Sequence, residues 1–324
     1  MKLPKRGRKI NKTHSNQSYN QNTNEEANTS SGVVIANFGN QVLVQDANNF
    51  HYRCPQRNVI SQLVAGDKVL IREDESAADC DLTARVVGKL PRKNELLRPN
   101  AQKKLCPIAA NIDFIAIVVA SVPTPQPELI DRYVVASEAS GITPILVLNK
   151  SDLLEESKEL KESIGDLLAI YKKLDYVIVN TSAKHRRINN LKGFLKDKTS
   201  VLVGQSGVGK SSLINELLSR NASTVGPLSK GINKGTHTTT VAQLFDMDMG
   251  GSIIDSPGIR EFDLWHIPTK EVERSFREFS TYTDKCRFRD CRHRAEPNCA
   301  IKEAVRTGFI SEMRLRSFHS ITQQ

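Results

Sequence analysis

A glycine-rich loop that runs directly into lysine and serine constrains the fold of this chain more than any other feature. It reads Gly204-Gln205-Ser206-Gly207-Val208-Gly209-Lys210-Ser211, and a second serine, Ser212, comes next. Glycines let the backbone curl so that successive N–H groups point at phosphate oxygens, and the N-terminus of a following helix adds positive charge. We expect Lys210 to reach the β- and γ-phosphates of a nucleotide and Ser211 to ligate Mg²⁺.

The segments around this loop alternate between two kinds of pattern. Buried-strand runs lie at 112–120, 145–148, 176–179, 201–203 and 252–254, and helical patterns cover 127–140, 154–170, 188–195 and 210–220. Strands alternating with helices predict an α/β fold with a doubly wound parallel sheet. Ligands of such a sheet bind at the carboxyl ends of its strands, which is where the loop lies.

Two further loops predict which base the nucleotide carries. The sequence Asn149-Lys150-Ser151-Asp152 follows one predicted strand, and Thr181-Ser182-Ala183-Lys184 follows the next. A carboxylate in the plane of guanine accepts hydrogen bonds from N1–H and N2–H₂ together, which adenine does not offer, and we assign this role to Asp152. Lys150 would cover the base with its stem, Asn149 would brace the loop, and the Ala183 amide would meet guanine O6.

Other residues are suited to Mg²⁺ and the γ-phosphate. Asp255-Ser256-Pro257-Gly258 follows the last predicted strand. We expect Asp255 to hold Mg²⁺ through water and the Gly258 amide to meet the γ-phosphate. Thr238, Thr239 and Thr240 lie in a glycine-rich stretch before this motif. We expect Thr239 or Thr240 to close on Mg²⁺ and the γ-phosphate as a switch.

These elements are those of a GTPase domain, but in an altered order. In an ordinary GTPase the phosphate loop comes first and the base-reading loops come last, whereas here the loops at 149 and 181 precede the one at 204. The order indicates a circular permutation, which is physically permitted because the site depends on positions in space. Movement of the second switch, 255–262, would then pass to the segment that follows it.

A smaller β-rich unit precedes this domain. Short β-branched or aromatic runs at 33–36, 41–45, 50–54, 68–72 and 82–87 are separated by turn residues. They fit a small OB-like barrel, although an SH3-like barrel gives a similar pattern. Residues 11–31 are polar and are expected to be disordered. We therefore expect a tail at 1–31, a barrel at 32–100, the GTPase domain at 108–265 and a helical zinc-binding domain at 266–324.

The charge of the chain is concentrated outside its middle. The 324 residues carry a formal charge of +10, with +4 in residues 1–31, +6 in 85–104 and +4 in 270–324. Basic flanks around a near-neutral centre favour a polyanionic partner, although any one cluster could simply be a solvated surface. The 39% hydrophobic content excludes a mostly disordered chain. With no long apolar run, we expect no membrane partner, no secretory signal and a cytoplasmic location.

Three cysteines and a histidine near the C-terminus have the composition of a metal site. Cys286, Cys291, His293 and Cys299 fall within fourteen residues. Such a set is sufficient for a closed, structural zinc site, and the alternative is a few reduced thiols beside a surface histidine. Four arginines and Phe288 are interleaved with these ligands, which gives a basic surface suited to RNA. Cys54, Cys80 and Cys106 are isolated and are interpreted as ordinary thiols.

The combination of these motifs resembles one family. An OB-like barrel, a permuted GTPase with N-K-S-D, T-S-A-K, H-T-T-T and D-S-P-G-I-R-E-F, and a Cys₃His element are together similar to the ribosome small subunit-dependent GTPase A family, also called RsgA or YjeQ. The resemblance covers residues 33–310. It implies slow GTP hydrolysis that the small ribosomal subunit stimulates, binding to that subunit and its rRNA late in maturation, and release of a ribosome-binding assembly factor. We expect a monomer.

The residue that would orient the attacking water in an ordinary GTPase is missing. A glutamine just after the D-x-x-G motif has that role in Ras-like enzymes, and Ile259 occupies the position here. We therefore expect slow intrinsic hydrolysis of GTP to GDP. His237, just before the threonines, is the polar substitute that the sequence offers, although it could be an exposed loop histidine.

Two other function classes remain open from the sequence. One is an RNA-binding module whose nucleotide site is regulatory and barely hydrolyses GTP. The other is a P-loop ATPase or kinase, which the N-K-S-D motif disfavours. Phosphate release measured with and without small ribosomal subunits separates the enzyme from the binding module.

Overall fold

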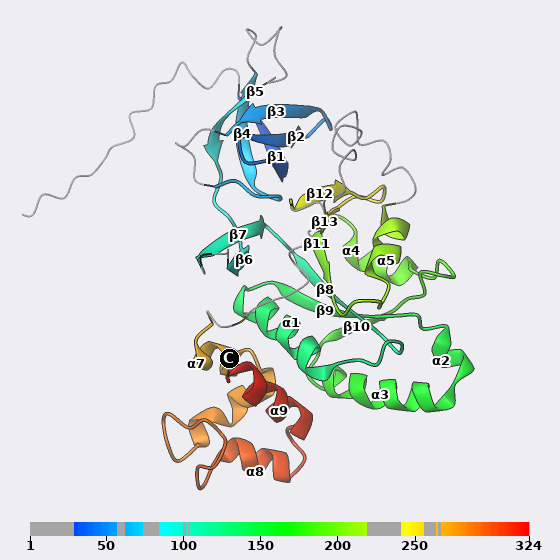
Figure 1. The fold of residues 1–324 in the computed structure, drawn as a ribbon, viewed down its shortest axis with the longest axis vertical. Coiled ribbons are helices and arrows are strands. Elements are labelled where there is room, and N and C mark those ends of the chain that lie inside the picture. Colours follow the sequence, from blue (N-terminus) through cyan, green and yellow to red (C-terminus); the bar gives the residue numbers. More distant parts are fainter. Residues whose placement is uncertain are drawn as a thin grey trace, which may run out of the picture.

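The computed structural model describes residues 29–56, 62–73, 84–99, 102, 104–218, 241–255, 264 and 267–323. A β-barrel lies at one end, an α/β sheet lies in the middle, and a helical C-terminal element lies at the other end (Figure 1). The described strands form one continuous sheet of eleven strands and a separate two-stranded hairpin. No helix in the described residues is long and apolar enough to cross a membrane.

The central sheet has the doubly wound arrangement that the sequence predicts. Its strands run in the order β10-β9-β8-β11-β13-β12, and β12 is antiparallel to its neighbour while the others are parallel. They are β8 (Phe114–Ala120), β9 (Thr143–Asn149), β10 (Val177–Asn180), β11 (Thr199–Val203), β12 (Gln243–Asp246) and β13 (Ser252–Asp255).

Alternation along β8 assigns the helices to the two faces. Ile115 and Ile117 pack with α1 and α3 on one face, whereas Ala116 and Val118 pack with α4 and α5 on the other. Successive strand side chains point to opposite faces, so a strand that is apolar at every position needs a helical layer on each side. The helices are α1 (Pro127–Ala139), α2 (Leu153–Glu156), α3 (Lys158–Lys172), α4 (Asn189–Leu195) and α5 (Lys210–Leu217).

The single helix expected over 154–170 is two helices. Ser157 adopts an extended conformation, φ −139° and ψ 116°, and separates α2 from α3. Its hydroxyl accepts a hydrogen bond from the amide of Leu160 at 3.3 Å. A serine side chain that caps a new helix competes with continuation of the old one, and the helical periodicity on both sides hides this break.

The N-terminal strands close into a barrel. Backbone pairing runs in the order β3-β2-β1-β4-β5, and β3 also lies against β5. This is the ring of a five-stranded OB-like barrel, and it encloses an apolar core that includes Val34, Val44 and Ile71. The strands are β1 (Ser30–Asn37), β2 (Gln41–Asp46), β3 (His51–Pro55), β4 (Lys68–Glu73) and β5 (Ala84–Lys89).

Two connections fix the barrel to the α/β sheet. Strand β1 pairs with β12 through Ala36 and Gln243, so the two sheets are continuous. A hairpin of β6 (Glu95–Pro99) and β7 (Leu105–Ala110) lies between them, and the sequence analysis does not predict either of its strands. Arg92 just before the hairpin donates to both carboxylate oxygens of the buried Asp67, each at 2.7 Å.

The C-terminal element packs on α1 around aromatic side chains. Phe276, Phe279 and Phe318 form its centre, and Val135 and Ala136 of α1 complete the same core. The element contains α7 (Thr269–Arg274), the 3-10 turns η5 (Arg277–Thr281) and η6 (Thr283–Lys285), α8 (Ala300–Arg306) and α9 (Glu312–Ile321).

A buried guanidinium joins this element to the α/β domain. Arg314 of α9 donates to Asp131 of α1 and, from Nε at 2.6 Å, to Glu278 of η5. The Tyr171 hydroxyl of α3 donates to the same Asp131 carboxylate at 2.8 Å. Arg314 and Asp131 are both 0% exposed, and the guanidinium also lies 4.3 Å from the centre of the Phe276 ring. Burial alone would lower the pKa of Arg314, but its two carboxylate partners raise it.

Replacement of Arg314 by alanine is expected to destabilise this junction strongly. The substitution leaves Asp131 buried without its counter-charge, which typically costs about 3–5 kcal/mol. Urea denaturation, followed by circular dichroism and by tryptophan fluorescence, measures the loss. Arg316→Ala is the matched control, because Arg316 lies on the same helix with its side chain 74% exposed and, among the described residues, forms an ion pair with Glu312 alone. Equal stability of the two variants would show that the buried network does not stabilise the fold.

Candidate nucleotide site and metal centre

The phosphate loop lies between β11 and α5, and its glycines are required by close packing. Gly204 has φ +142°, and a Cβ there would lie 2.2 Å from the carbonyl oxygen of Val118 on β8. Gly209 has φ +96°, and a Cβ there would lie 2.4 Å from the side-chain nitrogen of Asn149. Any other residue would push the loop away from the strands that position it.

The side chains of the loop differ in their surroundings. Lys210 donates from Nζ to the carbonyl oxygens of Gly204 at 2.7 Å and Gln205 at 2.8 Å, so its ammonium group lies over the loop. Val208 is buried among the residues under α5. The remaining positions of the predicted set are solvent-exposed: Ser206, Gly207, Ser211 and Ser212.

Asn149 joins this loop to both base-reading loops. Its amide nitrogen donates to the carbonyl oxygen of Val208 at 2.9 Å. Its amide oxygen accepts from the backbone N–H of Ala183 at 3.2 Å and from the hydroxyl of Thr181 at 3.3 Å. The side chain is 2% exposed, so these bonds are sheltered from water. One carboxamide therefore fixes the relative positions of three loops that are separate in sequence.

Lys150 and Ser151 add further bonds between the loops. Lys150 adopts φ +57° and donates from Nζ to the carbonyl oxygens of Val122 and Gly207, both at 2.8 Å. Its stem thus bridges from the end of β9 to the phosphate loop. The amide of Ser151 donates to the carbonyl oxygen of Thr181 at 3.0 Å.

Asp152 is held by the neighbouring base-reading loop. The hydroxyl of the buried Ser182 donates to Asp152 Oδ1 at 2.5 Å, and this bond lowers the pKa of the Asp152 carboxyl. The carboxylate therefore stays ionised and keeps its capacity to accept hydrogen bonds at neutral pH. His185 Nε2 lies 3.8 Å from Oδ2, a neighbour that the sequence analysis does not identify. Its only signal in the sequence is its place directly after T-S-A-K.

Asp255 is the last residue of β13, beside the strand that leads into the phosphate loop. Strand β13 pairs in parallel with β11, and Ile254 is opposite Val201. Asp255 is exposed and lies one residue beyond the Ile254–Val201 pair, toward the carboxyl edge of the sheet. The other predicted switch and catalytic residues lie outside the described residues: His237, Thr238, Thr239, Thr240 and Gly258.

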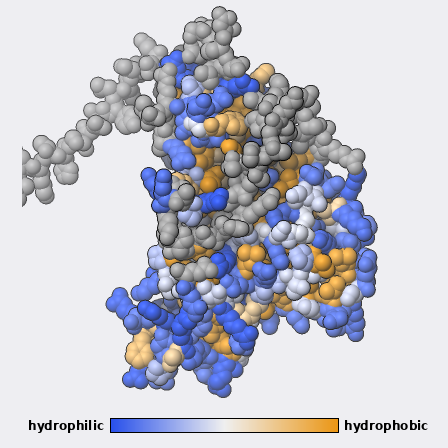
Figure 2. Space-filling model, viewed as in Figure 1, coloured by the Kyte–Doolittle hydropathy of each residue, from blue (hydrophilic) through white to orange (hydrophobic). Residues whose placement is uncertain are grey.

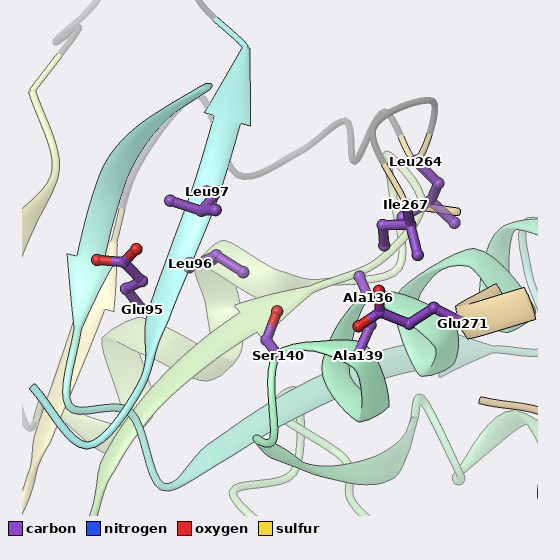
Figure 3. A pocket seen from close by; sticks show the side chains of 9 residues that line it. All are labelled: Glu95, Leu96, Leu97, Ala136, Ala139, Ser140, Leu264, Ile267 and Glu271. Carbon is purple, nitrogen blue, oxygen red and sulfur yellow. The ribbon is translucent and has the colours of Figure 1, made fainter. Parts of the chain in front are cut away.

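A separate cavity of about 340 Å³ lies away from these loops, between β6, α1 and α7. Figure 3 shows Leu96 and Leu97 on one side of it and Ala136 and Ala139 of α1 on another. Leu264, which follows the second predicted switch in sequence, lines it as well. The cavity shares no residue with the phosphate loop or the base-reading loops. The candidate nucleotide site is therefore assigned from the geometry of those loops and not from this cavity.

The four predicted metal ligands converge in the C-terminal element. The ligand atoms of Cys286, Cys291, His293 and Cys299 all lie within 4.8 Å of one another. His293 Nδ1 is 3.3 Å from Cys299 Sγ and 3.7 Å from Cys286 Sγ. A zinc tetrahedron with Zn–S of about 2.3 Å and Zn–N of about 2.0 Å has edges of roughly 3.5–3.8 Å, so the donor set fits this ion.

The surroundings of the cluster affect its thiols and its histidine differently. Burial raises the pKa of the Cys291 thiol to about 12, and it also raises the pKa of Cys299. Burial thus favours the protonated thiol, and a bound metal ion would reverse this preference because it stabilises the thiolate directly. His293 is 1% exposed and packs between Phe279 and Phe318, and its other ring nitrogen lies 3.4 Å from Glu273 Oε1. A carboxylate in that position orients a metal-bound imidazole.

Comparison with known proteins places the chain in a family. The RsgA GTPase family model matches residues 89–265. The chain is 45% identical over 295 residues to the small ribosomal subunit biogenesis GTPase RsgA of Pseudomonas fluorescens strain Pf-5, which covers 90% of this chain and 84% of that protein. It is 46% identical over 291 residues to the protein of the same name from Pseudomonas aeruginosa strain LESB58, with coverage of 90% and 84%.

Solved structures agree with this assignment. YjeQ from Thermotoga maritima superimposes with a TM-score of 0.72 at 32% identity, covering 91% of this chain and 98% of that one. YloQ, described as a circularly permuted GTPase, gives a TM-score of 0.71 at 27% identity, with coverage of 93% and 96%. The family model, the close relatives and the shared fold agree, and the chain belongs to the RsgA GTPase family.

Proposed function

We propose that this protein hydrolyses GTP to GDP and phosphate and that it acts in maturation of the small ribosomal subunit. The relatives carry that role in their names, and the family is one of GTPases. The observation that carries the proposal in this chain is the bridge from Asn149 to Val208 and Ala183. It bonds the proposed base-reading loops directly to the proposed phosphate-binding loop, which a single nucleotide would have to contact together.

Each loop has a role toward the nucleotide in this proposal. Asp152 accepts from guanine N1–H and N2–H₂, and the Ala183 amide donates to O6. The backbone amides of 204–209 and the Lys210 ammonium bind phosphate oxygens, and Ser182 keeps Asp152 ionised and oriented. The helix α5 directs its N-terminus at the same phosphates.

Two metal ions belong to the proposal. Ser211, Asp255 and one switch threonine, Thr239 or Thr240, would hold Mg²⁺, which would supply positive charge beside the phosphates of GTP. Zn²⁺ would be held by Cys286, Cys291, His293 and Cys299, where it supplies folding energy and leaves no open position for catalysis.

Hydrolysis depends on how the attacking water is oriented. Ile259 offers no hydrogen bond at the position where Ras-like enzymes use glutamine, so we propose slow intrinsic turnover. His237 would orient the water once the subunit has docked, and Thr239 would complete the switch. We further propose rRNA as the direct partner, a monomer that works in the cytoplasm, and assistance in release of an assembly factor.

Asp152→Asn is expected to change the base that the site selects. Asparagine presents one donor and one acceptor in place of two acceptors, so GTP affinity falls and discrimination against ATP weakens. Xanthosine triphosphate, which carries an oxygen at position 2, should bind the variant better than the native protein. Titration with fluorescent nucleotide analogues measures all three affinities. Asp166→Asn, at an exposed site on α3, is the control, and equal preference for GTP in both variants would refute the assignment.

GTP turnover is expected to rise when small ribosomal subunits are added. Phosphate release is measured with and without purified subunits for the native chain and for His237→Ala. We expect the variant to bind GTP normally and to lose most of the stimulation. If stimulated turnover is unchanged in the variant, His237 is not the orienting group. Negligible release by the native chain even with subunits would favour the regulatory RNA-binding alternative.

The purified chain is expected to contain one zinc ion, and Cys299→Ser is expected to lose it. Cys106→Ser is the matched control, because that thiol lies in β7 outside the cluster. Glu273→Gln should weaken zinc binding by about 10–100-fold, since it removes the carboxylate beside His293. Metal analysis and competition with a chromogenic chelator give both results. Full zinc content in Cys299→Ser would contradict the assignment.

A further inference from the structure

The C-terminal element exposes an aromatic side chain that the proposed chemistry does not use. Phe309 is 74% exposed, the highest value among the large apolar residues in the described part of the chain. It stands beside Tyr282, with ring centres 6.5 Å apart and planes tilted by 37°. The Lys285 ammonium lies 5.3 Å from the centre of the Tyr282 ring.

The backbone holds Phe309 outward by a specific turn. Helix α8 ends before Gly308, which has φ +79°, and the amides of Phe309 and Ile310 both donate to the carbonyl oxygen of Ala304, at 2.9 and 3.1 Å. This closure buries Ile310 to 2% exposure and leaves the neighbouring ring in solvent. Phe309 is therefore presented on a fixed backbone, and ordering it on binding costs little.

Tyr282 and Lys285 are fixed from the other side. Tyr282 packs against the aromatic core of the element, and its backbone amide donates to the carbonyl oxygen of Phe279 at 2.9 Å. Lys285 directly precedes the metal ligand Cys286 in the chain. The metal cluster and the aromatic core thus set the position of both groups relative to Phe309.

The segment that carries these rings is basic, which favours a polyanion. Residues 282–309 contain seven Lys and Arg against four Asp and Glu, a formal charge of +3. Two of those carboxylates are engaged, Glu303 with Arg306 and Glu296 with the backbone of its own loop. Arg287, Arg289 and Arg292 are exposed and form no ion pair within the described residues. The surface of the element in Figure 2 is mostly hydrophilic, with isolated apolar side chains.

We propose that Phe309 and Tyr282 form a stacking platform for an unpaired RNA base, with Lys285 beside it to meet the adjoining phosphate. An exposed ring beside a second ring and a lysine matches an unpaired nucleotide, which offers the π-face of its base and a phosphate together. A base inside a duplex has both faces covered, so the ligand is a single-stranded segment. The proposal deepens the proposed function, because it rests on RNA as the partner and names how one base is held.

The test uses the full-length zinc-loaded chain and a fluorescein-labelled 12-nucleotide RNA, either single-stranded or as a duplex. Fluorescence anisotropy measures the affinity for each RNA at salt concentrations from 50 to 300 mM. Phe309→Ala is expected to weaken single-strand binding on the order of tenfold without changing the salt slope, since stacking releases no counterions. Phe309→Trp should retain or tighten it. Lys285→Ala should instead lower the salt slope by about one.

Phe194→Ala is the matched control, because that ring is 44% exposed on α4, far from the C-terminal element in Figure 1. Zinc content and GDP affinity confirm that each variant folds. Single-strand affinity of Phe309→Ala equal to the native value overturns the proposal, as does equal loss for single strand and duplex. Loss of binding to small subunits with single-strand affinity intact would indicate a protein contact and also overturns it.

The proposed function can fail separately from this inference. If native protein shows no subunit-stimulated phosphate release, the enzyme role fails whatever the RNA titrations show. If stimulation is present and Phe309→Ala binds single-stranded RNA normally, only the stacking platform fails.

Discussion

The nucleotide site depends on the buried carboxamide of Asn149. Its two ends bond to the phosphate loop at Val208 and to the base-reading loop at Ala183, and neither bond is exposed to water. A buried amide left unpaired costs far more than the bond itself is worth, so the three loops are constrained together. This constraint acts through space, which explains why a GTPase site survives when the chain visits its loops in a different order.

A second buried polar group joins the C-terminal element to the α/β domain. Arg314 is bonded to α1 through Asp131 and to η5 through Glu278, and Tyr171 of α3 joins the same carboxylate. Movement of the second switch was expected to pass directly into the segment after it. The network opposes free swinging of the element, because separation would expose or orphan a buried charge pair. The element and α1 therefore present one continuous surface beside the metal cluster.

The sequence predicted most of what motifs and periodicity can encode. It predicted the doubly wound sheet, the barrel strands and the gathering of Cys286, Cys291, His293 and Cys299, and its assignment of the phosphate loop and the base-reading loops stays a prediction. It did not predict β6, β7 or β12, because short strands with mixed exposure lack a distinct alternation. It joined α2 and α3 because the same helical period continues across Ser157. His185 beside Asp152 and the partners of Arg314 come from segments whose proximity no local pattern reports.

The sequence by itself determined which chemistry the chain can perform. Glycine spacing, a lysine and a serine predict phosphate binding, and an aspartate after a strand predicts guanine, because these signals depend on residue types in local order. Only the tertiary structure decided that Asn149 reaches Val208, that four ligand atoms lie within 4.8 Å, and that Phe309 faces solvent beside Tyr282. Those are distances between residues that are not neighbours in the chain, and they are set by the packing of the elements that carry them.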